Sequence, residues 1–445
     1  MILFIHRKDL RIEDMSAFDY ILEQQSASVH LLILDPFLLK RDRHLAHSGI
    51  NFMKHVRRLH QLYRDANKQL HLAYGEPAEV VHALLTQLQF TEVVVHRDFT
   101  PYAITRDRKL QQVIDRFHIP FTRIVDHTLI DLADFQRFTT RKDPYQIYTP
   151  FYRKWHEYIE LHIPLRSRIN VCQLTTVNLA EGILDPFLMP FSLTDYSSAD
   201  DPQHVLDSFV RDHLSHYPHM RDQYAIEGTS LLSRHTNVGA ISIRHIYETV
   251  HRIDHATPWI RQLAWRDFYI YQSMFNADYF QYEKRYDLSS LNDRYFENWI
   301  RATTGIPIID AAMTELSETG CMPNRLRMVT AMFLAKNLAC SFTSGEQYFR
   351  HALSDYDNTL NRGGWLWSSS LGFDAAPYFR IMNPVTQSQT HDPSGDYIRK
   401  WLPELKDLNN KDIHLPRRHA IVDLKASRAE AIGIYKSILS SASNE

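Results

Sequence analysis

Short apolar runs alternate with helical patterns over residues 1–125. The runs are rich in β-branched residues and predict strands at Ile2–His6, Val29–Asp35, Leu70–Tyr74, Val93–His96 and Thr122–Val125. The stretches between them carry apolar residues at helical spacing and predict helices at Ser16–Gln25, Asn51–Ala66, Pro77–Leu88 and Ala103–Phe117. This alternation predicts an α/β domain with a doubly wound, parallel, five-stranded sheet, whose ligands bind beyond the carboxyl ends of the strands.

The pattern changes twice after this region. Residues 126–199 show no steady period and are interrupted by prolines, which predicts a long interdomain connector over the surface. Helical periodicity prevails from residue 200 onward. The sequence therefore predicts an α/β domain over 1–125, a connector over 126–199 and an all-helical domain over 200–440, which agrees with the two domains expected for 445 residues.

Composition and charge narrow the class of protein. Lys and Arg total 50 against 52 Asp and Glu, which excludes a uniformly basic nucleic-acid binder but leaves room for a local basic groove. No apolar run approaches the roughly 18 residues of a membrane span, and Met1 leads directly into a predicted strand, so we expect a cytoplasmic protein without a membrane partner. Cys172, Cys321 and Cys340 are too scattered for a disulfide framework or a zinc site.

Two segments of the helical region contain candidate binding residues. Arg325 and Arg327 point to different faces of a predicted helix, where they either meet an anion and a second partner or are merely solvated. Residues 353–384 contain Asp355 and Asp357, followed by a Gly-Gly pair that lets a flat ligand approach the backbone. Two carboxylates without a nearby histidine are too few for a metal, so we expect them to bind ribose hydroxyls or ring N–H groups.

Two further segments allow either a functional or a purely structural interpretation. The hydroxyl-rich run at 228–233 predicts a phosphate cradle or a simple helix N-cap. Four residues at helical spacing share much of one face, namely Gln262, Trp265, Arg266 and Tyr269. Such a face suits a flipped base and its phosphates, or else consists of a core tryptophan beside a surface arginine.

Taken together and in order, these motifs resemble the photolyase/cryptochrome family of flavoproteins, most closely the bacterial-type cyclobutane pyrimidine dimer photolyases. The similarity runs through "HRKDLRIED" (6–14), "DFTPYAITRD" (98–107), "PYQIYTPFYRKW" (144–155), "EGTSLLS" (227–233), "WRDFY" (265–269), "TGIPIIDAAM" (304–313), "NRLRM" (324–328), "NRGGWLWSSS" (361–370) and "DAAPYFRIMNP" (374–384). The resemblance implies an α/β antenna domain, a long connector and a helical FAD-binding domain.

The resemblance also implies residue roles. Positions that bind FAD in the family are occupied by Tyr217, Thr229, Ser230, Leu231, Leu232, Ser233, Arg266, Asn324, Arg327, Asp355, Asp357 and Asn361. Positions that contact DNA are occupied by Arg221, Gln262, Trp265, Arg266, Arg325, Trp367, Arg380 and Gln387. Residues at catalytic positions around the flipped dimer are Gln262, Trp265, Asn324, Met328, Asn361 and Trp367, and Trp365 begins the electron-transfer chain. The implied partner is DNA that carries pyrimidine dimers, bound by a monomer.

The sequence departs from the family pattern at the reaction site and along the electron-transfer chain. Gln262 stands where dimer photolyases usually carry Glu, and an amide does not transfer a proton readily. Phe342 and Ser289 stand at the second and third tryptophan positions, so photoreduction must use another route or be slow. The tyrosines that we consider as substitutes are Tyr269, Tyr286 and Tyr348.

Two functions therefore remain in competition. The first is light-driven repair, in which excited reduced FAD splits cyclobutane pyrimidine dimers, the activity of a deoxyribodipyrimidine photo-lyase. The second is a cryptochrome-like flavin photoreceptor without repair activity, which Gln262 and the broken electron chain favour. The antenna chromophore also stays open between a folate, a deazaflavin, a second flavin and none, because Tyr102 and Ala103 stand where folate-binding Asn and Glu would be.

Overall fold

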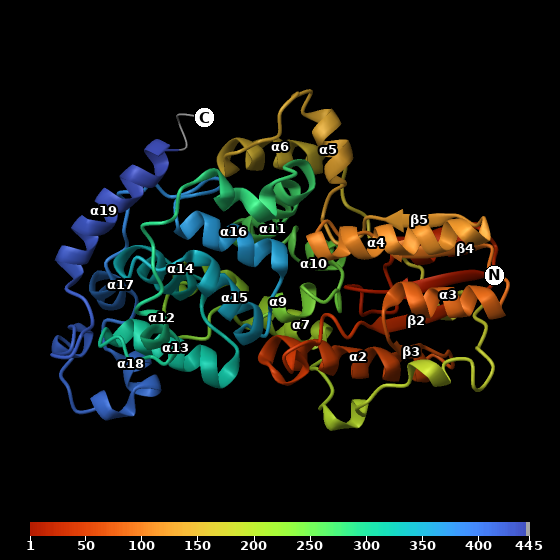
Figure 1. Ribbon diagram of the computed structural model, residues 1–445, viewed down its shortest axis with the longest axis horizontal. Helices are drawn as coiled ribbons and strands as arrows, with labels where there is room; N and C mark the ends of the chain where they lie inside the picture. The colour runs from red at the N-terminus through yellow and green to blue at the C-terminus, as the bar shows by residue number, and fades with distance from the viewer. Residues whose placement is uncertain (442–445) are drawn as a thin grey trace. The chain divides into compact units, whose positions relative to one another are not determined.

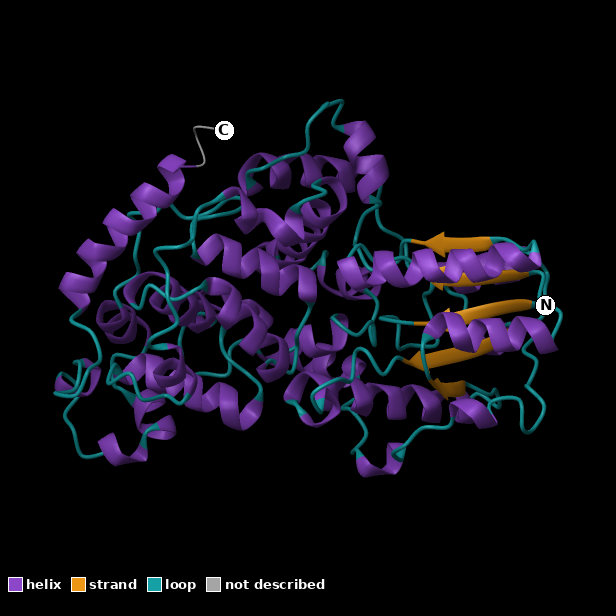
Figure 2. Ribbon diagram, viewed as in Figure 1, coloured by secondary structure: helices purple, strands orange, loops and turns teal. Residues whose placement is uncertain are grey.

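A computed structural model of the chain describes residues 1–441, which divide into two compact units. Unit 1 comprises residues 1–143, 152–214 and 230–274, and unit 2 comprises residues 144–151, 215–229 and those from 275 onward. The strands all lie in unit 1, and helices and loops make up the rest (Figure 2). No helix within residues 1–441 has both the length and the apolar character that a membrane crossing requires.

The sheet of unit 1 has five parallel strands in the order β3-β2-β1-β4-β5 (Figure 1). The strands are β1 (Ile2–His6), β2 (Ser28–Leu34), β3 (His71–Tyr74), β4 (Glu92–His96) and β5 (Phe121–Ile124). In the central register, Ile2 of β1 lies opposite Ser28 of β2 and Glu92 of β4. The chain runs outward from β1 in both directions, as the predicted doubly wound topology requires.

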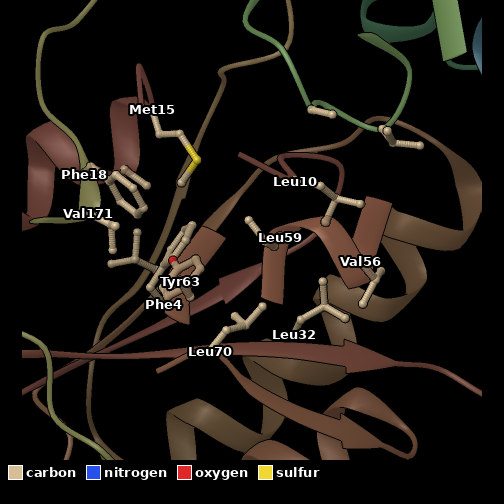
Figure 3. Packing of buried hydrophobic residues seen from close by; sticks show 14 of the residues in the cluster. Phe4, Leu10, Met15, Phe18, Leu32, Val56, Leu59, Tyr63, Leu70 and Val171 are labelled. Carbon is tan, nitrogen blue, oxygen red and sulfur yellow. The ribbon is translucent and has the colours of Figure 1, made fainter. Parts of the chain in front are cut away.

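Alternate side chains of the strands enter two hydrophobic cores, one on each face of the sheet. Phe4 and Leu32 face helices α1 (Ser16–Glu23) and α2 (His47–Asp65), whose buried residues include Phe18, Val56 and Leu59 (Figure 3). Neighbouring strand residues such as Leu3 and Leu31 face α3 (Pro77–Gln87) and α4 (Pro101–Ile114). Burial on both faces explains why the three inner strands, β1, β2 and β4, are largely apolar runs.

The predicted elements of the α/β region agree with the observed ones to within a few residues at each end. The largest differences are at α2, which begins four residues earlier than predicted, and at α4, which gives way to a 3-10 turn at Asp115–Phe117. The sheet and the helical remainder together confirm the predicted fold class of an α/β domain joined to a helical one.

The segment predicted as an irregular connector contains two helices, α5 (Leu132–Phe138) and α6 (Tyr148–Leu161). The prolines suggested a loop, but Pro150 lies in the first turn of α6, where the missing N–H has no intrahelical partner to lose. Residues 162–199 are irregular apart from short 3-10 turns, as expected. The domain limits at 125 and 199 remain a prediction.

The remaining helices follow the chain through both units. Those in unit 1 are α7 (Pro202–Asp212), α9 (Ser233–Thr236), α10 (Ile243–Val250) and α11 (Thr257–Phe275), the last residue of which begins unit 2. Those in unit 2 are α8 (Tyr217–Met220), α12 (Phe296–Ile300), α13 (Pro307–Thr319), α14 (Asn324–Met332), α15 (Phe342–Ala352), α16 (Asn358–Ser368), α17 (Pro384–His391), α18 (Asp396–Trp401) and α19 (Leu424–Ser441).

Candidate functional site

The predicted polar and aromatic face of α11 exists in unit 1. Gln262, Trp265, Arg266 and Tyr269 are all partly exposed, whereas the opposite face of the helix enters the core. Trp265 stacks on Tyr269 with ring centroids 5.8 Å apart and planes 30° apart. The Gln262 amide donates to the carbonyl of Pro258 at 3.4 Å. A core tryptophan is therefore excluded, and the face presents a stacked aromatic pair to a planar ligand.

The core side of α11 is anchored by Asp267, a residue that the sequence analysis did not single out. One carboxylate oxygen accepts from the Trp155 indole at 3.0 Å, and the other accepts from the backbone N–H of Leu129 at 3.2 Å. Burial raises the pKa of Asp267 to about 6. Beside it, the Arg266 guanidinium donates to the carbonyl of His127. These bonds hold the orientation of the face that carries Trp265.

The hydroxyl-rich run forms a tight loop before the short helix α9. Leu231 is exposed and has a φ of 51°, a left-handed conformation that costs a non-glycine residue about 1–3 kcal/mol. The Ser230 hydroxyl accepts from the backbone N–H of Leu232 at 3.4 Å. Thr229 lies at the end of its segment of unit 2, and Ser233 begins α9 and is exposed. Strain of this kind is typical of ligand-binding loops.

A cluster of arginine and tyrosine side chains lies in unit 2 around α8. The Arg221 guanidinium lies 5.8 Å from the ring centroid of Tyr217, which is nearly buried. The Arg325 guanidinium donates to the Asp222 carboxylate at 2.7 Å. Burial would raise the pKa of Asp222, but the hydrogen bond and positive charge of Arg325 hold it below its ordinary value. The two arginines therefore share one carboxylate and leave excess positive charge at this place.

The predicted residues of α14 divide between its two sides. Asn324 is exposed, and its amide nitrogen lies 3.7 Å from the sulfur of Met328. On another side, Arg327 donates to the carbonyl of Met322 at 2.8 Å and forms an ion pair with Asp355 at 3.0 Å. Arg325 and Arg327 therefore pair with different carboxylates of the protein, Asp222 and Asp355.

Helix α16 packs against α14 and α15 and carries further predicted cofactor contacts. The Asp357 carboxylate caps it by accepting from the backbone N–H groups of Thr359 and Leu360. The Asn361 amide donates to the carbonyl of Glu346 at 3.1 Å. Gly364, one turn further on, is exposed, and a Cβ built on it would meet nothing within 4 Å.

A glycine at this place favours a bound planar group. In a helix interior glycine costs about 1 kcal/mol relative to alanine, and the packing around Gly364 does not require it. A flat ligand that approaches the backbone next to Asn361 would require it. Together with the Arg327–Asp355 pair of the same unit, Asn361 and Gly364 fit a cofactor with a flat ring system.

The remaining predicted residues also lie in unit 2. Trp365 is 2% exposed, whereas Trp367 is partly exposed two positions further along α16. Arg380 is exposed on a loop whose backbone is held by the buried ammonium group of Lys336, which donates to the carbonyl of Arg380 at 3.3 Å. Gln387 is partly exposed on α17. The structure thus places the proposed DNA contacts of unit 2 at least partly in solvent.

Comparisons with known proteins identify the family. Residues 2–167 match the family described as DNA photolyase, and residues 259–440 match the FAD binding domain of DNA photolyase. The deoxyribodipyrimidine photo-lyase of Halobacterium salinarum is 31% identical, over 98% of this chain and 99% of its own. The corresponding protein of Thermus thermophilus is also 31% identical, with the same shares of the two chains.

Solved structures agree with this result. A class III photolyase from Agrobacterium tumefaciens superposes with a TM-score of 0.84 and 26% identity, over 99% of this chain and 98% of that one. An archaeal photolyase from Sulfolobus tokodaii with two FAD molecules gives a TM-score of 0.83 and 27% identity, over 98% of this chain and 100% of that one. A Synechocystis cryptochrome shares the fold, with a TM-score of 0.82 and 24% identity over 98% of this chain and 99% of that one.

The fold and the matched domains define a flavoprotein of the photolyase/cryptochrome class. The chain belongs to the DNA photolyase family. Its cofactor is FAD, as predicted, and the match to the FAD-binding domain of the family runs from the first turn of α11 into α19.

Proposed function

We propose that this protein repairs DNA by splitting cyclobutane pyrimidine dimers in light, as a deoxyribodipyrimidine photo-lyase. The observation that carries the proposal is the partly exposed Trp265–Tyr269 stack on α11, in a chain of the DNA photolyase family. An exposed aromatic stack favours an unstacked base pair as ligand, because every base has a face on which it can stack. The proposal includes action as a cytoplasmic monomer on DNA that carries the lesion.

The proposed roles follow from the chemistry of each side chain. Trp265, Trp367 and Met328 form the apolar walls for a flipped dimer, and the amides of Gln262 and Asn324 donate hydrogen bonds to its carbonyl oxygens. Bound FAD, once reduced, supplies the electron that light transfers to the dimer, so no protein nucleophile is required. Tyr217 and residues 229–233 hold the phosphate and ribitol part of FAD. Its ring systems are held by the five residues Arg266, Arg327, Asp355, Asp357 and Asn361.

The proposed DNA contacts are the arginines Arg221, Arg325 and Arg380 together with Gln387. Arginine side chains that neutralise phosphates give affinity that falls with salt and does not depend on the lesion. We expect Arg325→Gln to weaken binding to damaged and undamaged duplexes equally and to lower the salt slope by about 1. Flipping bases out of the duplex costs the least free energy when the pair is damaged. The preference for damaged DNA therefore depends on the residues that line the pocket and not on the arginines that contact phosphates.

A light-dependent repair assay tests the proposal. The protein, reduced with dithionite, is mixed with an oligonucleotide containing a thymine dimer and exposed to near-ultraviolet light, with a dark control. Loss of dimers in light alone is the expected result. Bound, reduced FAD without any repair would contradict the proposal and favour a photoreceptor.

Two tryptophan variants test whether Trp265 contacts the lesion. Trp265→Ala should weaken binding of the dimer by about 1–3 kcal/mol, because one stacking partner is lost. Trp401→Ala, which removes a partly exposed tryptophan elsewhere on α18, serves as the matched control and should leave binding unchanged. Equal effects of the two changes would show that Trp265 does not contact the lesion.

A further inference from the structure

Aromatic side chains of unit 2 pack around Trp365 and are candidate electron donors to it. Phe342, at the place where the family's second tryptophan stands, is fully buried at the start of α15. Its ring lies 5.4 Å from the guanidinium carbon of Arg362. A phenyl ring is harder to oxidise than an indole or a phenol. Phe342 is therefore a poor electron donor to Trp365.

A different tryptophan is in contact with Trp365. The ring centroids of Trp365 and Trp299 lie 6.1 Å apart at an interplanar angle of 71°, an edge-to-face contact. Trp299 comes from α12 and is fully buried. Gly345 on α15 makes room for this arrangement, because a Cβ there would come within 2.2 Å of the Trp365 ring.

The indole N–H groups of Trp299 and Trp365 differ in their hydrogen bonds. The indole N–H of Trp299 donates to the carbonyl of Thr330 at 3.2 Å. The indole N–H of Trp365 is buried and has no hydrogen-bond partner within residues 1–441. A carbonyl dipole aimed at the N–H stabilises positive charge on Trp299. The hydrogen bond to Thr330 therefore favours oxidation of Trp299 by an oxidised Trp365.

Tyr348 is the phenol next to Trp299. Its ring centroid lies 5.7 Å from that of Trp299 at 71°, and its side chain is partly exposed on α15. Tyr286, another substitute considered from the sequence, belongs to a different cluster, 6.4 Å from Tyr282. Partial exposure matters because an oxidised phenol must release its proton, and Tyr348 can release it to water.

We propose that Trp365, Trp299 and Tyr348 form the electron-transfer chain of this protein. This inference rests on the proposed function, because it takes Trp365 as the first donor to light-excited, oxidised FAD. One electron leaves Trp365 for the cofactor, one passes from Trp299 to Trp365, and one passes from Tyr348 to Trp299. The Tyr348 phenol releases its proton to water, and an added thiol restores Tyr348 by giving up one hydrogen atom.

Flash photolysis of the FAD-loaded protein tests the chain through the identity of the radicals. Wild type should show an indole radical that is replaced by the narrow absorption of a tyrosyl radical. Trp299→Phe should lose the tyrosyl signal and the steady accumulation of reduced FAD in the presence of thiol. Tyr348→Phe should keep a long-lived indole radical without the tyrosyl signal. Trp299→Tyr, which keeps an oxidisable ring, should restore photoreduction.

Controls separate this inference from the proposed function. Trp401→Phe should behave as wild type, and all variants should repair dimers after reduction with dithionite. Photoreduction in Trp299→Phe at the wild-type level, or a tyrosyl signal that survives Tyr348→Phe, would overturn the chain. If the wild-type protein, reduced with dithionite, does not repair dimers in light, the proposed function is contradicted instead. If Trp299→Phe fails to fold, Tyr348→Phe alone decides, because Tyr348 is partly exposed and its replacement leaves the core intact.

Discussion

Acidification from about pH 7 to about pH 5 should destabilise unit 1 through two buried histidines. His55 on α2 and His235 on α9 are each 1% exposed, with ring centroids 5.0 Å apart and planes at 89°. None of their four ring nitrogens has a hydrogen-bond partner within residues 1–441. Burial, followed by the positive charges around them, lowers the pKa of His55 to about 3 and that of His235 to about 4.

The size of the effect follows from proton linkage. In the unfolded chain both histidines have a pKa near 6.5, so between pH 6.5 and the folded values the unfolded state binds more protons. Their contribution to the free energy of unfolding is complete above pH 6.5 and is lost as the pH falls toward 4 and then 3. Between pH 7 and pH 5 the loss is about 2 kcal/mol for each histidine, and about 4 kcal/mol for the pair.

Urea unfolding at several pH values, followed by circular dichroism, measures this loss. His55→Leu replaces the imidazole with an apolar side chain of similar volume and should reduce the loss between pH 7 and pH 5 by about 2 kcal/mol. His204→Leu, on the exposed side of α7, is the control and should leave the loss as in wild type. If the His55→Leu variant loses as much free energy of unfolding between pH 7 and pH 5 as wild type does, the reasoning is refuted. Such a result would show that His55 is hydrated or paired in the folded state.

Three further predictions concern the cofactor domain and the reaction. Gly345→Ala should lower the free energy of unfolding by about 1–3 kcal/mol, and with it the urea midpoint, because the new Cβ would clash with Trp365. Gly364→Ala should instead raise the free energy of unfolding of the apoprotein by about 1 kcal/mol and weaken FAD binding in a titration. Arg362→Leu should cost about 3–5 kcal/mol of unfolding free energy, because it leaves the carboxylates of Glu283 and Glu346 without their partner; an unchanged urea midpoint would contradict this. Gln262→Glu should raise the repair yield per photon if the missing carboxyl limits proton transfer, and an unchanged yield would reject that explanation.

Much of the fold could be predicted because its determinants are local and periodic. A parallel strand buried on both faces must be an apolar run, so the inner strands β1, β2 and β4 were visible in the sequence. The exposed face of α11 was likewise predictable from the helical spacing of Gln262, Trp265 and Tyr269. Helix α6 was missed, because a proline near a helix start reads in the sequence like a proline in a loop.

The candidate site could be predicted in its residue types but not in its pairings. The sequence placed Arg325 and Arg327 on different helix faces and left open whether they are solvated, and it did not indicate Asp222 for one and Asp355 for the other. The substitute for the broken tryptophan chain was left open among three tyrosines, and Trp299 was not considered. The signal available was a tryptophan in a short helix that also contains Phe296 and Ile300, and it is indistinguishable from an ordinary core residue.

The sequence by itself determined the elements of the α/β region, the class of fold and the family, because periodicity and ordered motifs are properties of neighbouring residues along the chain. The tertiary structure alone decided which buried groups meet, such as Trp299 with Trp365 and His55 with His235. These contacts join helices distant in the chain, and their partners are selected by packing of whole elements against one another. No local pattern records such a choice, which is why the route of the electron and the sensitivity to acid could be inferred only from the folded chain.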